Sequence, residues 1–600
     1  MSEVENKIIE MHKERWLGDS EINAEWLARA RESFQFYTGI QQWDQEALDT
    51  LAREGRPALT LNLVFPIVNM LAGYQSQNRH DMKLYPRRGG SVGIAALGTE
   101  LIKHTLDSCQ GLHELTDDFI DGCICGKGWA SMDRVYEDDI IGGDLVLAKE
   151  SPFSMLEDQL NKSYQLNKGT HVFKTFWWSK EHIELMYPGK AKDLAGATED
   201  PQWEDDKYDL HVHANKNSEY DSGTGADISG YRTKRQYKCK EAWHKVYKKS
   251  VYVIDLATFN KVRLKKREEI EKAQQAIKAL NDQYAIQERI APVLYKDVIC
   301  GDMLLEHVED PLNGLTMFPF FRFCPYWVDG YIMGVIDNLK QAQQRHNKAE
   351  SQNLHHINTM ANAHWVKAKG GKPITQPVLD EFKENISSAG YIVDEDKIGG
   401  TMRRERAEGP NIAQVTMAER SAQAIKDISG VNSSLVEQGQ EGKESGKAKI
   451  LRQQAGLIVS QIIFDNFSRT ETDVGSFTWE VIRNTNVYSD EEIGFIVQEN
   501  QLKHFIGQDG QLDLSPIRTM ALGRYGVKVG QSSNLPTVRM AHFEEMAQLL
   551  KAGVPIPPQF LLELSDLPNK DEVIEYLKRV SQMPAQGQQR ALPAQAGAVA

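Results

Sequence analysis

Hydrophobic residues between Tyr331 and Trp365 recur at intervals of three or four, and no proline interrupts them. This spacing is typical of one helix with a narrow apolar stripe. The other positions are mostly amides, among them Asn338, Gln343 and Asn347. At about 1.5 Å per residue such a helix would extend roughly 50 Å. We expect it to pack beside other helices and to expose a neutral polar face to water. A solvated coiled-coil arm is an equal alternative.

The rest of the chain alternates between helix-like and strand-like stretches. Helical periodicity marks residues 20–54, 62–78 and 98–120, and short strands separated by turns follow over 126–173 and 231–260. A chain of 600 residues can hold two to four domains, because one domain takes roughly 100–200 residues. The composition, 41% hydrophobic and 26% charged, is that of an ordinary folded protein. We therefore predict an α+β protein that is mainly helical.

Two long helices are predicted to flank a compact, strand-rich tip. A charged helix covers residues 262–290, the strands cover 291–325, and the amide-rich helix follows. Residues 366–412 are rich in glycine and charge and predict an irregular loop. The C-terminal part predicts a long helix capped by Ser445, two short helices and a disordered end, at 446–486, 537–551, 570–580 and 581–600.

Membrane, secretion and disulfide signals are weak. No stretch approaches the roughly 20 apolar residues that cross a bilayer, and the charged N-terminus lacks the apolar core of a secretion signal. We expect an intracellular protein without membrane contact. Six cysteines do not make a disulfide framework in a chain of this length. Cys123 and Cys125 lack a second pair to complete four zinc ligands, so buried reduced thiols are predicted.

The net charge of −14 argues against a protein that grips nucleic acid over its whole surface. The charge is unevenly placed. Residues 231–267 hold 13 Lys and Arg against Glu241 and Asp255, whereas residues 199–230 hold nine Asp and Glu against two lysines. The simpler interpretation of the basic segment is a solvated strand pair with cationic outer faces. A partner surface is the alternative.

The sequence contains no convincing catalytic or metal-binding motif. Residues 439–449, GQEGKESGKAK, lack the glycine spacing of a phosphate-binding loop, and Lys447 is followed by Ala448 where a hydroxyl is needed. Adjacent carboxylates rarely converge on one ion, and adjacent histidines on a helix point in different directions. The pairs concerned are Asp117-Asp118, Asp138-Asp139, Asp205-Asp206 and His355-His356. We predict no enzyme activity, no cofactor and no metal site.

A series of short segments, none specific alone, follows one order along most of the chain. It comprises GIQQW at 39–43, RPALTLN at 56–62, Gly73, KLYPRR at 83–88, the turn Gly126-Lys127-Gly128-Trp129 between a helix and a strand, VLYKDVICGDMLLEHVEDP at 293–311, Pro319, Pro325, Ser429-Gly430-Val431, Ser445-Gly446-Lys447-Ala448, Arg452-Gln453 and YGVKVGQSSNLPTVRMAHFEEMAQLL at 525–550. This order resembles the portal proteins, the head-to-tail connectors of short-tailed double-stranded DNA bacteriophages.

The resemblance implies a portal fold that assembles about twelve copies into a ring around a channel. Its parts are a wing, a helical stem, a strand-containing clip and a short helical crown. The implied positions are the wing at 1–260 and 413–535, the stem helices at 261–290 and 328–365, the clip at 291–327, a channel (tunnel) loop at 366–412, the crown at 536–580 and a disordered tail at 581–600.

The same resemblance implies a structural role at a capsid vertex of the virion, after assembly in the host cytoplasm. The partners would be other copies of the chain, the terminase packaging motor, a tail adaptor or head-completion protein, capsid and scaffolding proteins, and double-stranded DNA in the channel. Residues expected at the channel or between stems are Lys340, Gln344, Arg345, Lys348, Asp337 and Glu350. Residues expected to dock partners at the clip are Tyr295, Lys296, Asp297, Asp302 and Glu306.

Sliding DNA should meet few phosphate-binding cations, because each Lys or Arg that touches a phosphate adds affinity. An amide-lined helix and a negatively charged ring fit this requirement. For the three cations of the helix, we favour pairing with Asp337 and Glu350 of a neighbouring copy over contact with DNA. Two alternatives remain: a terminase-type ATPase, which would need a phosphate-binding loop, and a coiled-coil scaffold that binds no DNA and forms small oligomers.

Overall fold

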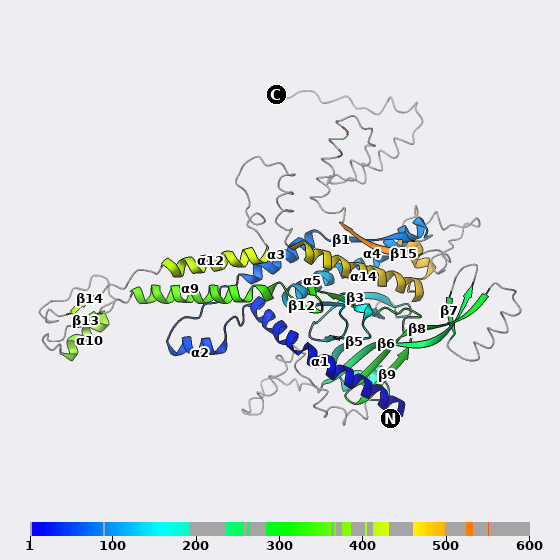
Figure 1. Ribbon diagram of the computed structural model, residues 1–600, viewed down its shortest axis with the longest axis horizontal. Helices are drawn as coiled ribbons and strands as arrows, with labels where there is room; N and C mark the ends of the chain where they lie inside the picture. Colours follow the sequence, from blue (N-terminus) through cyan, green and yellow to red (C-terminus); the bar gives the residue numbers. More distant parts are fainter. Residues whose placement is uncertain are drawn as a thin grey trace.

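The computed structural model contains a broad body of helices and sheets from which a pair of antiparallel helices projects (Figure 1). The pair consists of α9 (Lys340–Ala361) and α12 (Ile412–Ser429). The structure describes residues 3–87, 90–137, 140–190, 236–255, 261–264, 284–361, 365–367, 375–385, 402–404, 412–430, 460–485, 487–497 and 524–531, with single residues 546 and 550.

The N-terminal region is helical, as predicted. Its helices are α1 (Glu3–Thr38), α2 (Gln45–Arg53), α3 (Val64–Gln77), α4 (Val92–Ser108) and α5 (Gly111–Cys125). Trp26 and Leu27 face the core. Asn62 accepts hydrogen bonds from the backbone N–H groups of Val64 and Phe65, and thereby caps the start of α3.

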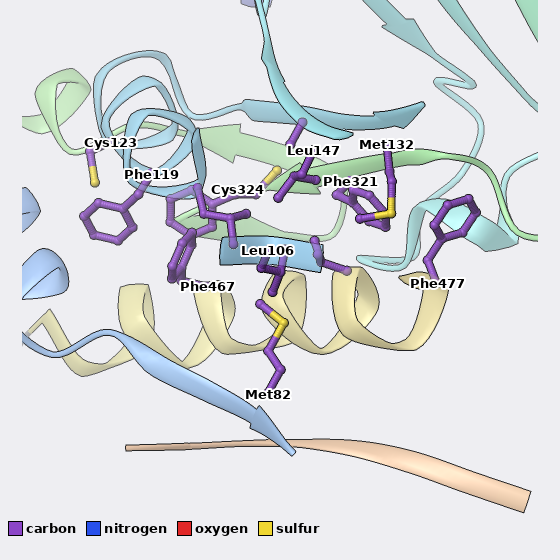
Figure 2. Close-up of a cluster of buried hydrophobic side chains, with 14 of the residues drawn as sticks. Met82, Leu106, Phe119, Cys123, Met132, Leu147, Phe321, Cys324, Phe467 and Phe477 are labelled. Atoms are coloured by element: carbon purple, nitrogen blue, oxygen red, sulfur yellow. The ribbon is translucent and has the colours of Figure 1, made fainter. Parts of the chain in front are cut away.

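The core is centred on α5. Phe119 of α5 stacks on Phe323 with ring centroids 5.2 Å apart and meets Phe467 edge-on at 5.1 Å. Phe323 belongs to β10 (Phe320–Phe323) and Phe467 to α14 (Gln461–Thr485). Figure 2 shows that this cluster joins side chains from distant parts of the chain. The core of the body therefore depends on contacts between α14 and the N-terminal helices.

The largest sheet contains six strands in the order β4-β5-β6-β8-β9, with β7 paired to β6. The pairs are antiparallel. The strands are β4 (Met155–Glu157), β5 (His171–Ser179), β6 (Gln236–Asp255), β7 (Lys261–Leu264), β8 (Tyr284–Cys300) and β9 (Met303–Glu309). The mixed α+β class is confirmed, with more strand than the sequence indicated.

Smaller sheets complete the body. β10 pairs with β2 (Gly128–Val135), which pairs with β3 (Asp144–Glu150). β1 (His80–Arg87) pairs with β15 (Arg524–Gln531). The short helix α6 (Lys180–Met186) follows β5, and α15 (Asp490–Ile496) follows α14. Leu166–Lys168 and Ile336–Asn338, termed η1 and η5, are single 3-10 turns.

Residues 262–290 were predicted as one charged helix, and this is wrong where the structure describes them. Lys261–Leu264 form β7, and β8 already begins at Tyr284. The strands predicted over 291–325 exist, but Val293, Val298 and Cys300 are buried in the central sheet. Charge alternation suits an exposed helix and a solvated strand equally, and the pairing with β6 decides between them.

The amide-rich helix begins later than predicted. Tyr331–Met333 form β12, which pairs with β11 (Tyr326–Val328) in a hairpin. The two residues between these strands, Asp329 and Gly330, have φ angles of 49° and 88°. An Asp-Gly pair between aromatic and β-branched residues is a strong hairpin signal. The helical spacing of the flanking apolar residues concealed it.

Several other predictions have definite outcomes. None of the six cysteines, all of which lie in the described part of the chain, forms a disulfide bond, and five of them are buried. Asp117 and Asp118 are not both surface carboxylates, because Asp118 is fully buried. Lys238 and Lys240 in the basic segment are buried too, rather than on a cationic outer face. Among the described helices, none combines the length and hydrophobicity required to traverse a lipid bilayer.

Some predictions lie outside the described residues. These are the phosphate-loop-like segment at 439–449, the first part of the helix predicted over 446–486, nearly all of the predicted crown at 536–580, the tail at 581–600, and the carboxylate pairs at 138–139 and 205–206.

Candidate functional site on the projecting helical hairpin

The helices α9 and α12 touch through small residues. Ala349 of α9 and Ala418 and Ser421 of α12 are buried. The Arg345 side chain donates a hydrogen bond to the Ser421 hydroxyl across 2.8 Å, and a ring nitrogen of His346 lies 3.2 Å from the Ala418 carbonyl oxygen. Small side chains allow two helices to approach closely. The pair is therefore a packed unit that leaves the body as one projection (Figure 1).

Lys340 anchors the base of this hairpin to α1. Its ammonium group lies 2.7 Å from the Glu32 carboxylate, 3.1 Å from the carboxylate of Asp337 and 3.1 Å from the Arg29 carbonyl oxygen. Asp337 also accepts a hydrogen bond from the Ser33 hydroxyl. Pairing of Lys340 with an acid was predicted across two subunits. The structure places the pair with Asp337 inside one chain instead.

One row of amides on α9 holds an extended segment of the chain. The backbone N–H groups of Leu59, Leu61 and Leu63 donate to Ser351, Asn347 and Gln343, at 2.8, 3.1 and 3.1 Å. The acceptors are spaced four apart, on one helix face, and the donors are spaced two apart, on one edge of an extended chain. The helix face thus substitutes for a neighbouring strand.

This amide row is buried rather than exposed to water. Gln343 and Asn347 are both 0% exposed. Gln343 also donates to the Leu61 carbonyl oxygen, and Asn347 donates to the side chain of Gln42. These two amides cannot line a channel in this structure. The sequence interpretation assigned one role to all the amides because it could not separate the faces of the helix.

Other positions of α9, outside the amide row, are polar and accessible. Arg345 and Lys348 are exposed, and Gln344 and Glu350 are half-buried. Lys348 lines a cavity of about 840 Å³ between α9 and the α2 region. Trp43, Leu51, Arg56, Ser351 and His355 are among the other lining residues. Two of the three predicted helix cations therefore stand where a partner molecule can reach them.

The end of the hairpin carries elements of its own. β13 (Trp365–Lys367) pairs antiparallel with β14 (Met402–Arg404), and α10 (Gln376–Asn385) lies between them in sequence. Figure 1 places all three at the far end of the projection. Residues 366–412 were predicted as an irregular loop, so the regular elements within them correct that prediction.

The residues predicted to dock partners at a clip lie elsewhere, in the central sheet. Tyr295 is 4% exposed and Asp297 is 0% exposed. Lys296 and Glu306 are half-buried: Lys296 lies 3.4 Å from Glu241, and Glu306 accepts a hydrogen bond from Tyr187. Asp302 is half-buried beside the turn between β8 and β9. The structure does not bring these five side chains to the tip of the projection.

Asp297 instead joins three histidines. His12 Nε2 lies 2.7 Å from one carboxylate oxygen, His244 Nδ1 lies 3.3 Å from the same oxygen, and His307 contacts the other. Burial lowers the pKa of His12, and it lowers the pKa of His244 to about 3. Burial opposes ionisation of Asp297, but hydrogen bonds from His12 and His307 hold its pKa below the usual range.

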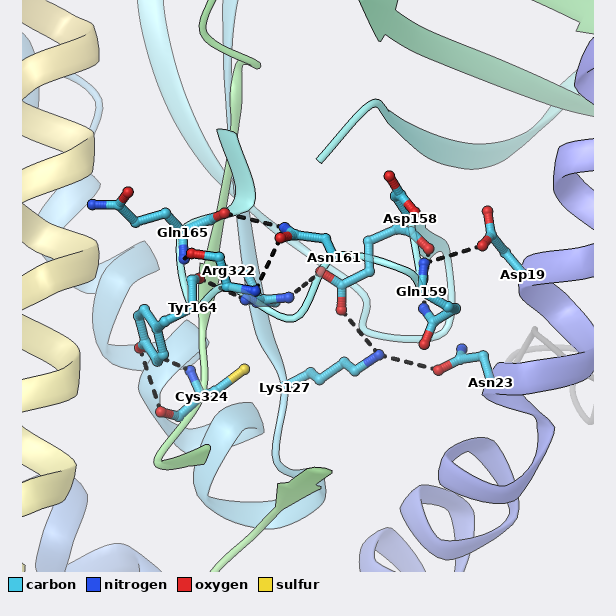
Figure 3. Close-up of polar contacts among 12 residues, drawn as sticks. Asp19, Asn23, Lys127, Asp158, Gln159, Asn161, Tyr164, Gln165, Arg322 and Cys324 are labelled. Atoms are coloured by element: carbon cyan, nitrogen blue, oxygen red, sulfur yellow. Dashed lines mark hydrogen bonds and ion pairs between the residues drawn. The ribbon is translucent and has the colours of Figure 1, made fainter. Parts of the chain in front are cut away.

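A second buried network fixes the turn Gly126-Lys127-Gly128, which lies between α5 and β2 as predicted (Figure 3). The Lys127 ammonium group lies 3.2 Å from Glu157 and 3.1 Å from the Asn23 side-chain oxygen. Glu157 also pairs with Arg322, and Arg322 donates to the Tyr164 carbonyl oxygen at 2.6 Å. This network ties α1 and β10 together.

Comparison with known families gives one result. The family model described as Phage P22-like portal protein matches residues 13–600. No curated protein matches the sequence significantly.

Proposed function

Because this chain belongs to the Phage P22-like portal protein family, we propose that the projecting hairpin is the stem of a ring-shaped DNA channel. Family membership makes the chain a structural, non-enzymatic head-to-tail connector with a role at the capsid vertex in genome packaging. The observation that carries the finer assignment is the pairing of α9 with α12. They form an extended two-helix projection with a separate set of elements at its end.

This assignment keeps α9, which lies within the stem helix expected at 328–365, and changes the other stem helix and the clip. Residues 261–290 and 328–365 were expected to be the stem helices, with the clip at 291–327. We assign the stem to α9 and α12 and the clip to the elements between them, β13, α10 and β14. The body, including the six-stranded sheet, then corresponds to the wing. In this arrangement the clip is the part of each copy farthest from the body, where a packaging motor or tail adaptor could reach it.

The charge distribution on α9 favours weak contact with DNA. The helix carries three cations and one carboxylate, and Lys340 is already paired with Glu32 and Asp337. Arg345 and Lys348 remain on the accessible face. Few accessible cations mean few released counterions, and therefore a small salt dependence of binding. A duplex can slide past such a surface without being held.

Ring closure also requires each copy to bury a surface of its neighbour. Helix α2 fits this role, because none of its residues is buried in its own chain. Its leucines Leu48 and Leu51, three residues apart on the helix, are half-buried, and Leu51 lines the cavity next to α9. We propose that a neighbouring copy covers this face. Leu48→Asp together with Leu51→Asp should then prevent ring formation and leave the circular dichroism spectrum unchanged.

Electron micrographs of the purified full chain test the main proposal. Closed rings of about twelve copies with a central channel are expected. A monomer under every assembly condition would contradict it. A particle of two or three copies would favour the coiled-coil scaffold instead.

The two accessible cations allow a test of the stem assignment. Replacing Arg345 and Lys348 by Gln should change the salt dependence of DNA passage or retention in assembled rings. Each phosphate that the protein no longer neutralises reduces the slope of log affinity against log salt by about 0.9. Lys162→Gln with Lys168→Gln, on a body loop, is the matched control. An identical effect of both pairs would contradict the assignment of α9 to the channel.

A further inference from the structure

The strongest unexplained feature is a convergence of metal-ligand atoms between α1 and the six-stranded sheet. His12 of α1, His244 of β6 and Asp297 of β8 are 0%, 3% and 0% exposed. One ligand atom from each residue lies within 4.8 Å of the other two. Their positions in sequence are far apart, so the fold alone brings them together.

The cluster is incompletely satisfied by its own hydrogen bonds. Both His12 Nε2 and His244 Nδ1 point at a single carboxylate oxygen of Asp297, at 2.7 and 3.3 Å. The His244 Nδ1 atom is buried and makes no hydrogen bond of good geometry. A buried polar atom without a partner costs about 1–3 kcal/mol. Such a cost, at a point where three ligand-type side chains meet, requires an explanation.

We propose that this cluster binds one divalent transition-metal ion, Zn²⁺ in the first place. His12 Nε2, His244 Nδ1 and Asp297 Oδ2 would be the three protein ligands, with a water molecule as the fourth. Zinc accepts imidazole nitrogen and carboxylate oxygen at about 2.0–2.2 Å, and such ligands in a tetrahedron are roughly 3.3–3.5 Å apart. The spacing between His244 and Asp297 already has this value, and the spacing between His12 and Asp297 must open slightly.

The surroundings fit this role. His307 holds the other oxygen of Asp297 and thereby orients the carboxylate, which is how outer partners usually support a metal ligand. The His307 side chain is 40% exposed, so the site is one residue away from solvent. The His244 ring stacks on Tyr295 with centroids 5.3 Å apart, which fixes its plane. Arg15 is the cation facing this cluster, and Asp19 and Asp158 offset its charge.

The ion would fasten α1 to the sheet. About two turns before its end, the same helix offers the Arg29 carbonyl oxygen and the Glu32 carboxylate to Lys340 at the base of the hairpin. A metal at His12 would therefore stiffen the connection between the sheet and the projection. This inference does not depend on the function proposed for the hairpin. The site needs only the fold of the body.

Zinc binding to the full chain tests the proposal. Protein dialysed against micromolar Zn²⁺ and then against metal-free buffer should retain one zinc per chain by elemental analysis. His244→Gln and Asp297→Asn should each weaken binding by more than 100-fold, and His307→Gln by about 10- to 100-fold. His171→Gln is the matched control, because His171 also joins α1 through a buried carboxylate, Asp19, at 2.6 Å. The His171→Gln variant should bind zinc as tightly as the wild type does.

The failing outcomes are equally definite. No retained zinc in the wild type, or equal retention in His244→Gln, would overturn the site. Should the sheet variants fail to fold, His12→Gln and X-ray absorption of the zinc-loaded wild type decide the question. Nitrogen and oxygen ligands with imidazole scattering support the site, whereas sulfur ligands would assign the zinc to cysteines and reject it. Loss of retention in His171→Gln would also reject it, because the binding would then follow the anchoring of α1 in general.

Discussion

Asp118 shows how a single buried carboxyl group can restrict which residue is allowed next to it. The side chain is 0% exposed, and neither carboxyl oxygen has a hydrogen-bond partner among the described residues. A Cβ atom on Gly128 would overlap one of these oxygens, so the start of β2 must be glycine. Gly126 is required for another reason, because its φ of 90° is in the left-handed region. The two glycines of this turn therefore have separate causes.

Replacing Asp118 by Asn should stabilise the protein at neutral pH. Burial raises the pKa of Asp118 well above its usual value, and nearby Asp121 adds to the shift. A carboxyl whose pKa is higher in the folded state destabilises that state increasingly as the pH rises above its unfolded pKa of about 3.9. Asn cannot ionise, so the advantage of the variant should grow from pH 5 to pH 8. Urea unfolding at both values measures it, with exposed Asp117→Asn as the control.

Replacing Glu157 by Gln should destabilise the body strongly. Lys127 and Arg322 are then left buried without their carboxylate, and losing one member of a buried ion pair costs about 3–5 kcal/mol. Arg322 and Lys127 lower the pKa of Glu157 despite its burial. The contribution of Glu157 to the free energy of unfolding is thus complete above the ordinary pKa of Glu. It is lost as the pH falls through the lowered pKa of the folded state. Glu3→Gln, which removes the exposed pair with Lys7, should change the free energy of unfolding by under about 1 kcal/mol.

At the scale of elements, the polar face of α9 performs two tasks. One row of side chains, Gln343, Asn347 and Ser351, holds residues 59–63. Positions outside this row carry the accessible cations Arg345, beside α12, and Lys348, beside α2. The buried side resembles a strand edge in its hydrogen bonding. A polar helix face can therefore be part of a core if each amide finds partners. This arrangement couples the base of the hairpin to the segment that follows α2.

Asn347→Ala should loosen that segment. The substitution leaves the Leu61 N–H and the Gln42 side chain without their acceptor and donor, at a cost of about 1–3 kcal/mol. We expect a lower urea midpoint and faster proteolysis between residues 53 and 64. Gln341→Ala removes an exposed amide from the same helix and should change neither. Equal effects of the two substitutions would show that the hydrogen-bond row contributes nothing specific.

At the scale of the whole molecule, the folding of the body depends on residues 291–325, whereas the end of the projection is formed by elements that pair with one another. Residues 291–325 contribute to β8, β9 and β10 and supply buried side chains such as Leu294, Ile299 and Phe321. The elements beyond α9 pair with one another at the far end of the hairpin, as Figure 1 shows. The strand-rich segment that the sequence indicated as a tip is thus in the core, and the actual tip lies beyond α9.

Two deletions test whether the body needs each of these two segments in order to fold. Removing 291–325 should abolish cooperative unfolding, because the central sheet loses β9 and most of β8. Replacing 362–411 by a short glycine-rich linker should leave the unfolding transition of the body within about 1 kcal/mol, as for changes remote from a core. Circular dichroism during urea titration compares them. A folded protein after the first deletion would contradict the described sheet, and an unfolded one after the second would show that the tip supports the body.

The sequence alone determined the family, because the order of short segments along the chain can be recognised without knowing which residues are in contact. It also determined the N-terminal helices, the turn at 126–128 and the strands of 126–173, since their periodicity and turn residues act locally. The Asp329-Gly330 turn carried an equally local signal, which the helical spacing around it obscured.

Only the tertiary structure decided which face of α9 is buried, where the projection lies and how Asp297 meets His12 and His244. Each depends on pairing between residues far apart in the chain. The energy of such contacts comes from burial and from satisfied polar groups, and neither exists until the partner element is in place. Sequence analysis therefore assigns a polar amide or carboxylate to the solvent-exposed surface, even where the fold buries it.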